Sequence, residues 1–267
     1  MTTHDPEHVV VAGDWHGNTP WAVGVIRQLP RLLPGQRRIL LHTGDFGVWP
    51  GLSGARYLNA VNQALVDVDG ELLFIDGNHE DFGQLYDLAP DPATIDPVTV
   101  HDRITWLPRG HRWTWHDRRW LALGGAVSVD AKQRTPQISW WPEEVITEGQ
   151  ARRAVADGPV DVVVSHDCPS TVPLRLGPPS ASWAPRDLIL SDWHRGLVQD
   201  IVDEVEPSFL LHGHYHLEHD TTVRMAHGDV RVTGFACDEM LSGNWRTLDV
   251  RSMEFTTGPT VRAAASR

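Results

Sequence analysis

Short apolar runs that end in polar, glycine-containing loops recur along this chain. The first run, Val9 to Ala12, is unbroken, which is typical of a strand covered on both faces. After a sharp loop, Thr19 and Pro20 provide an N-cap and a first residue for a helix. We expect this helix to stop between residues 30 and 35, where prolines and a glycine occur, and Ile39 to Leu41 to form the next strand.

The same alternation continues through the rest of the chain. Helices are expected at residues 53–67, 142–156 and 187–204, and strands at 71–75, 160–164 and 209–211. Shorter strands are expected near 103–107 and 118–123, and a proline-rich surface loop at 169–185. Alternating stretches at 220–226, 229–234 and 246–254 predict an antiparallel finish. Strands interleaved with helices in this way predict an α/β or α+β fold.

No internal repeat, linker or low-complexity segment divides the sequence. A chain of 267 residues can bury a substantial core. We therefore expect a single domain at residues 1–255 and a flexible C-terminal tail at residues 256–267.

Polar side chains follow five of the predicted strands directly. They comprise carboxylate, imidazole and amide groups, namely Asp14, His16, Asp45, Asn78, His79, His166, His214 and His216. Ligands of open α/β sheets gather at the carboxyl ends of the strands, so these loops should converge in space. This mixture of oxygen and nitrogen ligands suits divalent Mn, Fe, Co, Ni or Zn.

The number of these groups indicates two metal ions rather than one. Seven ligands exceed what one tetrahedral zinc requires, but they suffice for two adjacent ions that share a bridging ligand. Asp45 is the natural bridge, because it follows the central strand. Paired ions can activate a water and clamp both the attacking and the leaving oxygen of a phosphoryl group. His79 then remains as a proton carrier beside the ligand Asn78.

The net charge and the length of the apolar runs limit the expected binding partners and the expected location of the protein. The formal net charge is −12, from 23 basic and 35 acidic residues, which disfavours a broad electrostatic contact with duplex nucleic acid. A small anionic substrate or a single nucleotide remains compatible with that charge. The apolar runs are too short to cross a bilayer, and no signal-peptide pattern is evident. We therefore expect a cytoplasmic protein that is not inserted in a membrane.

With these residues in this order, the sequence resembles the calcineurin-like metallophosphoesterase superfamily. Five blocks carry the resemblance in the family's order: GDWHG, GD, GNHE, a histidine after an apolar strand (VVVSHD), and GHYH, over residues 13–216. It implies a four-layer αββα sandwich of two mixed β-sheets flanked by helices, with a dimetal site at the carboxyl ends of the strands. It also implies that water activated by the two ions hydrolyses a phosphate ester, with His79 as the catalytic general acid. The implied ligands are Asp14, His16, Asp45 and His216 for one ion, and Asp45, Asn78, His166 and His214 for the other.

One block departs from a subgroup of that superfamily. Serine/threonine phosphoprotein phosphatases extend the second block as GD-x-x-D-R-G, whereas this chain has Val48 and Trp49 at the aspartate and arginine positions. The subgroup is therefore disfavoured, and a cation that contacts substrate phosphate must come from elsewhere. Arg134 in the central loop is the first candidate for substrate binding, and Arg109 is the second.

Alternatives remain open at the level of residues and of the whole chain. Read singly, Asp14 could cap a helix and His166 could be an ordinary core histidine. The favoured hypothesis is a phosphomonoesterase or phosphodiesterase acting on a small molecule or nucleotide. The alternatives are a metal-binding regulatory or partner-binding module with little turnover, and a protein whose metals are structural. The sequence leaves the oligomeric state, the native substrate and the identity of the metals open.

Overall fold

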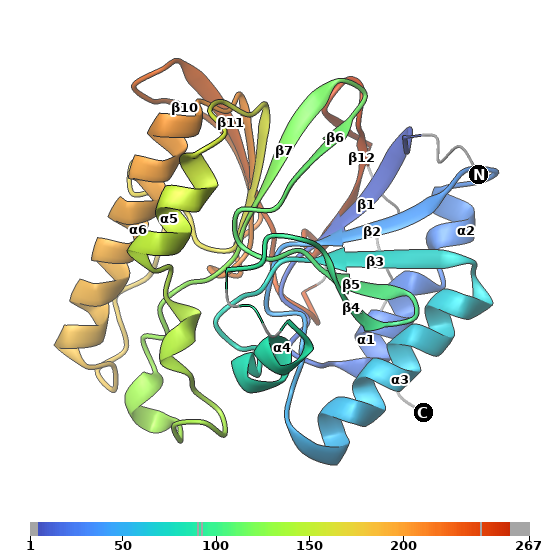
Figure 1. Cartoon of the computed structure of the whole chain (residues 1–267), viewed down its shortest axis with the longest axis horizontal. Coiled ribbons are helices and arrows are strands. Elements are labelled where there is room, and N and C mark those ends of the chain that lie inside the picture. The colour runs from blue at the N-terminus through green and yellow to red at the C-terminus, as the bar shows by residue number, and fades with distance from the viewer. Residues whose placement is uncertain (1–4, 90, 92, 241, 257–267) are drawn as a thin grey trace.

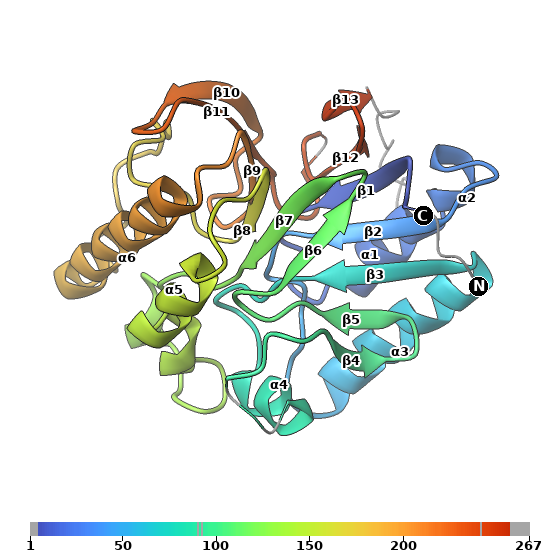
Figure 2. The same cartoon turned by 45° about the horizontal axis from the view of Figure 1, so that its top comes forward.

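Two β-sheets face each other in the structure, and helices cover the outer face of each sheet (Figures 1 and 2). The structure is a computed structural model that describes residues 5–89, 91, 93–240 and 242–256. Within these residues one sheet has seven strands and the other six, and both are mixed. The predicted four-layer αββα sandwich is thereby confirmed.

The seven-stranded sheet contains the first three predicted strands, side by side and parallel. Its order is β13-β12-β1-β2-β3-β5-β4. The strands are β1 (His8–Ala12), β2 (Arg38–His42), β3 (Gly70–Phe74), β4 (Val98–His101), β5 (Ile104–Trp106), β12 (Trp245–Asp249) and β13 (Glu254–Thr256). Since β1, β2 and β3 run in the same direction, the loops after them meet at one edge of the sheet.

The six-stranded sheet has a parallel centre formed by β7, β8, β9 and β11. Its order is β10-β11-β9-β8-β7-β6. The strands are β6 (Arg112–Trp115), β7 (Arg118–Leu123), β8 (Val162–Ser165), β9 (Phe209–His212), β10 (His219–Arg224) and β11 (Asp229–Gly234). The helices are α1 (Thr19–Ile26), α2 (Leu29–Leu32), α3 (Gly51–Asp67), α4 (Phe82–Leu88), α5 (Glu148–Val155) and α6 (Pro185–Val205).

The unbroken apolar runs are explained by burial on both faces of each sheet. Along β1, Val10 packs with α1 and α3, whereas Val9 and Val11 pack between the two sheets. Along β8, Val162 lies between the sheets, whereas Val163 packs toward α5 and α6. Side chains alternate across a strand, so each of these strands must be apolar at every position.

Several local predictions need correction. The expected helix at 142–156 is instead a 3-10 turn at Pro142–Glu144 and then α5, which begins with a capping box between Thr147 and Gln150. Between the two parts the Glu144 side chain is buried, and it accepts a hydrogen bond from the Ser128 backbone N–H. The helix α1 is capped by Asn18 rather than by Thr19.

The C-terminal strands also differ from the expected antiparallel finish. β10 pairs antiparallel with β11, but β11 joins β9 in parallel, and β12 crosses to the other sheet beside β1. The predicted tail at 256–267 starts with the last residue of β13 and otherwise lies outside the described residues. Among the helices described, none has both the length and the apolar character needed to span a bilayer.

Candidate metal centre

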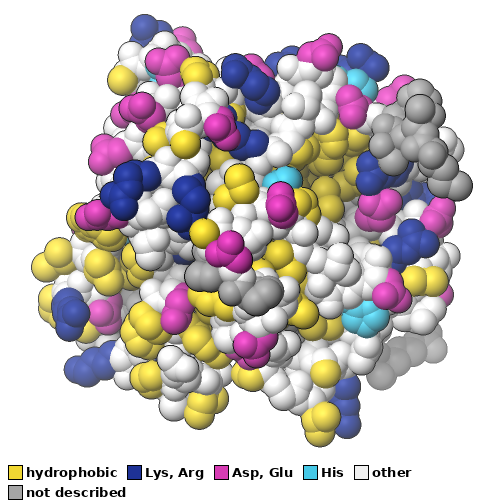
Figure 3. Space-filling view, in the orientation of Figure 1, with side chains coloured by type: hydrophobic (Ala, Val, Ile, Leu, Met, Phe, Trp, Pro, Cys, Tyr) yellow, Lys and Arg dark blue, Asp and Glu magenta, His cyan; other side chains and the backbone are white. Residues whose placement is uncertain are grey.

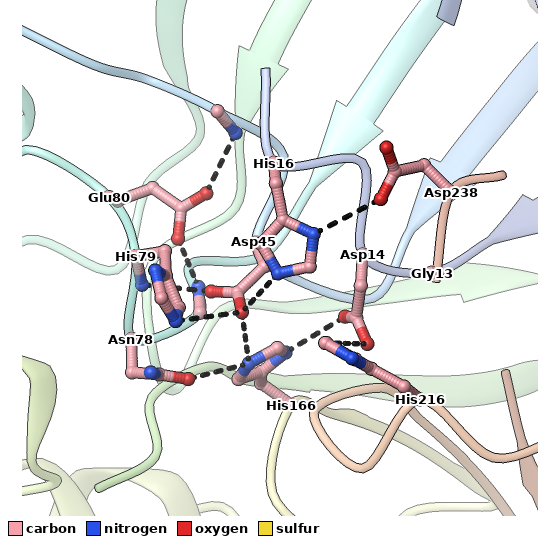
Figure 4. A network of polar contacts seen from close by, with 12 residues as sticks. Gly13, Asp14, His16, Asp45, Asn78, His79, Glu80, His166, His216 and Asp238 are labelled. Atoms are coloured by element: carbon pink, nitrogen blue, oxygen red, sulfur yellow. Dashed lines mark hydrogen bonds and ion pairs between the residues drawn. The ribbon is translucent and has the colours of Figure 1, made fainter. Parts of the chain in front are cut away.

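All eight polar side chains singled out from the sequence meet where the two sheets come together. Figure 4 shows the Asp45 carboxylate in the middle of this cluster, with the rings of His16, His79 and His166 turned toward it. The side chains come from loops after β1, β2, β3, β8 and β9. The convergence follows from the parallel arrangement of the strands, which places their carboxyl ends at a common edge.

The backbone around the cluster adopts conformations that most residues avoid. His16, Asp45, His214 and His216 all have positive φ angles, between 45° and 69°. Residues other than glycine enter this region at a cost of the order of 1–3 kcal/mol each, and they concentrate at functional sites. Gly44 leaves room for another cluster residue, because a side chain at this position would collide with the ring of His166.

Asp45 belongs to both of the two groups of side chains that could hold a metal ion. In one group it lies with His16 and His79, and in the other with His166 and His214; within each group all ligand atoms are within 4.8 Å of one another. Its Oδ2 atom lies 3.4 Å from Nε2 of both His16 and His166. This arrangement suits a carboxylate that bridges two cations.

Asp14 supplies the clearest sign that a cation belongs in the cluster. Its carboxylate is completely buried, and neither oxygen accepts a hydrogen bond from any residue that the structure describes. Burial raises the pKa of Asp14. The ring nitrogens His166 Nδ1 and His216 Nε2 lie 3.8 Å and 3.6 Å from its carboxylate oxygens. Because an unpaired buried carboxylate is costly, the donor set fits divalent metal ions.

The raised pKa values of two histidines also reflect the concentration of carboxylates in the cluster. Burial opposes a charge on His166, but the Asp45 carboxylate outweighs it and raises the pKa of His166 to about 10. Burial likewise opposes a charge on His16, but hydrogen bonds with Asp238 and Asp45 raise its pKa to about 11. Metal binding requires neutral imidazoles, so ions entering this cluster would displace these protons.

A chain of three hydrogen bonds sets the orientation of the Asn78 amide. Its Nδ2 atom donates to Ser128 Oγ at 3.0 Å, and that hydroxyl donates to Glu144 Oε2 at 2.6 Å. The Asn78 carbonyl oxygen therefore faces the cluster, 3.1 Å from His166 Nε2. The ring of His166 is fixed in turn, because its Nδ1 atom donates to the Thr43 carbonyl oxygen at 2.8 Å.

Asp238 orients His16 in a comparable way, and sequence analysis missed it. Its Oδ1 atom lies 3.4 Å from His16 Nδ1, and its Oδ2 atom accepts from Asn18 Nδ2 at 2.6 Å. Carboxylates that hold the second nitrogen of a ligating histidine commonly tune metal sites. Asp238 follows β11, whose parallel pairing with β9 brings its carboxyl end to the same edge. The available signal was an acidic residue shortly after a predicted strand. It was overlooked because an antiparallel strand at this place would not end at the edge where the cluster lies.

The two candidate arginines lie in different surroundings. Arg134 reaches the cluster: its guanidinium donates to His79 Nε2 and is held by Asp130 at 2.9 Å. Arg109 does not reach it, because its guanidinium is buried against Asp76 at 2.7 Å and also donates to the Glu144 and Val145 carbonyl oxygens. Arg109 thus holds the 142–146 segment in place and does not face the cluster.

Other bonds hold His79 in place. Its backbone N–H donates to Asp45 Oδ1 at 2.8 Å, and its carbonyl oxygen accepts from the Trp49 indole at 3.0 Å. The side-chain Nε2 lies 4.0 Å from Asp45 Oδ2. Burial lowers the pKa of His79 to about 4, and the nearby Arg134 charge acts in the same direction.

A cavity of about 640 Å³ opens beside the cluster. Asp45, Asn78, His79, His214 and His216 form one side of it. The opposite side consists of the loop before α6 and the first half of that helix. A small organic molecule could therefore reach the candidate metal-binding side chains directly.

Comparisons with solved structures find several proteins that are distant in sequence. They include the sulfate thiohydrolase SoxB of Thermus thermophilus (12% identity, TM-score 0.49, covering 93% of this chain and 54% of that one). A 5'-nucleotidase precursor from the same organism gives 15% identity, TM-score 0.45, and coverage of 94% and 53%. The phosphopantetheinyl hydrolase of Mycobacterium tuberculosis gives 14% identity, TM-score 0.44, and coverage of 92% and 97%.

The chain spans about half the length of the first two of these proteins, and none of the three similarities is high enough to carry an argument about substrate. A comparison with curated proteins gives no match. The family model for the calcineurin-like phosphoesterases, in contrast, matches residues 7–218, which include all eight cluster residues. The chain belongs to the calcineurin-like phosphoesterase family.

Proposed function

We propose that this protein hydrolyses a phosphate ester of a small molecule or nucleotide at a centre of two divalent metal ions. The observation that carries the proposal is the position of Asp45, whose carboxylate belongs to two groups of possible metal ligands, one with His16 and His79 and the other with His166 and His214. A site that only bound one ion would need neither the shared carboxylate nor the adjacent histidine. Membership in the phosphoesterase family supports the same reaction class.

Each proposed ion has a ligand set drawn from both sheets. One ion would be held by Asp14, His16, Asp45 and His216. The other would be held by Asp45, Asn78, His166 and His214. When bound, such a pair supplies Lewis acidity toward the phosphoryl oxygens and lowers the pKa of a coordinated water.

We assign His79 the role of proton donor to the leaving oxygen. In the present arrangement its Nε2 atom accepts from Arg134, and burial together with the Arg134 charge lowers the pKa of the ring, which favours its neutral form. A phosphate group placed between the two side chains would draw the Arg134 N–H groups to its own oxygens. The negative charge of that phosphate would also favour the protonated ring, so His79 could then donate. Arg134 would bind the phosphate in the same step.

The residues around His79 differ from those of the phosphoprotein-phosphatase motif. Val48 is buried, and the Trp49 indole holds the backbone of His79. Neither residue supplies the carboxylate or guanidinium of the phosphoprotein-phosphatase motif. In this chain Arg134 approaches His79 from the central loop instead. We therefore propose a small-molecule phosphoesterase that reaches phosphate through a different arginine.

The direct experiment measures hydrolysis of p-nitrophenyl phosphate and bis-p-nitrophenyl phosphate by metal-stripped protein resupplied with Mn, Ni, Zn or Mg. Metal-dependent turnover that disappears in Asp45→Asn would support the proposal, and the better substrate would indicate monoester or diester chemistry. Binding of about two ions per chain without turnover of either ester would favour a metal-binding module. A protein that binds no metal would refute the proposal.

A further inference from the structure

The cavity beside the metal centre has two chemically different sides. The metal-binding side chains form the polar side. On the opposite side the loop before α6 contributes Leu176, Pro178, Pro179 and Trp183, and α6 contributes Leu188. Leu176 is 51% exposed, so part of this apolar surface meets solvent. Figure 3 shows hydrophobic side chains, interspersed with charged ones, on the left and lower left of the molecule, where α6 and the segment before α5 lie.

The charged groups that line the cavity disfavour a ligand that carries a second anionic group besides its phosphate ester. Among the described residues that line the cavity, Arg195 is the one arginine or lysine. Its guanidinium already donates to the carbonyl oxygens of Cys168, Pro169 and Val172, and it lies over the ring of Tyr215. Asp192 adds a carboxylate to the lining beside Leu188. A phosphate or carboxylate on the far part of a ligand would therefore meet negative charge and no available cation.

We infer that the cavity binds the uncharged, largely apolar organic group of the phosphate ester, with Trp183 and Leu188 determining the preference. This inference rests on the proposed hydrolysis at the adjacent metal centre, because the phosphate must lie beside Asn78 and His79 for the organic group to reach α6. The cavity extends without interruption from the proposed metal ligands to the apolar side, so one ligand can contact both. Burial of apolar surface on Trp183 and Leu188 then stabilises the bound ester.

The first test compares three aryl monophosphates whose leaving phenols have nearly the same acidity. They are phenyl phosphate, 4-butylphenyl phosphate, and 4-(3-carboxypropyl)phenyl phosphate, which matches the butyl compound in length but carries an anion. We expect kcat/KM for the butyl compound to exceed that for phenyl phosphate by about 10- to 100-fold. The carboxylate compound should fall to the phenyl value or below it. Equal kcat/KM for all three esters would overturn the inference, while hydrolysis itself would still support the proposed function.

Variants in α6 and in the preceding loop test whether the apolar side of the cavity causes the preference for the butyl compound. In Trp183→Ala and in Leu188→Ala, the ratio of kcat/KM for 4-butylphenyl phosphate to kcat/KM for phenyl phosphate should shrink to about threefold or less. Trp193→Ala is the matched control, because Trp193 is an exposed tryptophan on α6 that does not line the cavity. A control variant that lost the preference equally would argue against selection by the cavity wall.

A binding measurement distinguishes failure of this inference from failure of the proposed function. Calorimetry with Mn²⁺-loaded protein would compare 4-butylbenzylphosphonate with benzylphosphonate, neither of which can be hydrolysed. We expect the butyl compound to bind about 10- to 100-fold more tightly to the wild type, and less than about threefold more tightly to Trp183→Ala. Equal affinities in the wild type would overturn the inference whether or not the protein turns over any ester.

Discussion

The substitution Ser128→Ala tests whether the metal centre depends on residues outside its own ligands. Ser128 accepts a hydrogen bond from the Asn78 amide and donates one to Glu144, both of them buried. Without the hydroxyl, the Asn78 amide loses the partner that directs its NH₂ group away from the cluster. It can then turn over and present that NH₂ group, which cannot ligate a cation, toward His166.

The expected magnitude follows from the bonds that are lost. A net hydrogen bond contributes about 0.5–1.5 kcal/mol, and one to a charged group about 1.5–3 kcal/mol. Loss of a residue that orients a ligand typically weakens metal binding by about 10–100-fold, which corresponds to about 1.4–2.8 kcal/mol. We expect this loss at the ion site that contains Asn78. The site that contains His16 and His216 should change by less than about threefold, because Asp238 orients His16 independently.

The assay is a titration of Mn²⁺ into metal-stripped protein, with calorimetry or a competing chelator resolving two classes of site. Ser208→Ala is the matched control, because Ser208 is exposed and directly precedes β9, at the strand end opposite to the metal centre. Ser128→Ala should weaken one class of site and leave the other nearly unchanged. If both classes kept wild-type affinity, Ser128 would not set the Asn78 orientation and the reasoning would be refuted.

Three further predictions concern catalysis, folding and pH. His79→Ala should lower kcat by about 10²–10⁴-fold while metal content, measured by mass spectrometry, stays unchanged; wild-type turnover would remove His79 from the mechanism. Arg109→Ala should lower the free energy of unfolding by about 3–5 kcal/mol in urea denaturation, because it leaves the buried Asp76 carboxylate unpaired. Arg37→Ala, which breaks an exposed ion pair, should cost less than about 1 kcal/mol, and a similar loss in both variants would contradict this account. Burial raises the pKa of Glu144 from 4.5 to about 7, so its contribution to stability declines as pH rises from about 4.5 through about 7. Glu144→Gln should flatten that decline by up to about 3 kcal/mol in denaturation at pH 5 and pH 8, and an unchanged slope would show that Glu144 is not responsible.

The cluster could be predicted from the sequence because its residues directly follow strands. Asp14, Asp45 and Asn78 come after apolar runs that are interleaved with helices, and such strands pair in parallel. Parallel strands end at a common edge, so neighbouring loops must meet there whatever the details of packing. His166 and His214 follow the same rule in the second sheet.

The substrate-contacting cation could not be chosen from the sequence. Arg109 and Arg134 both lie in loops outside the predicted helices and strands. Only packing distinguishes them, because Arg109 meets the buried Asp76 while Arg134 extends past Asp130 to His79. These partners are 33 and 55 residues away from their arginines, which is beyond the reach of any local pattern.

The sequence by itself therefore determined the succession of strands and helices in the first half of the chain and the set of groups available for metal binding. These features depend on local periodicity and on which residue types follow each strand. Tertiary structure alone decided which groups orient those ligands. Asp238 joins His16 because β11 pairs with β9 in parallel, and Glu144 reaches Ser128 because its expected helix is interrupted. Contacts of this kind depend on long-range pairing, in which the stabilisation comes from burial and hydrogen bonds that no single segment contains.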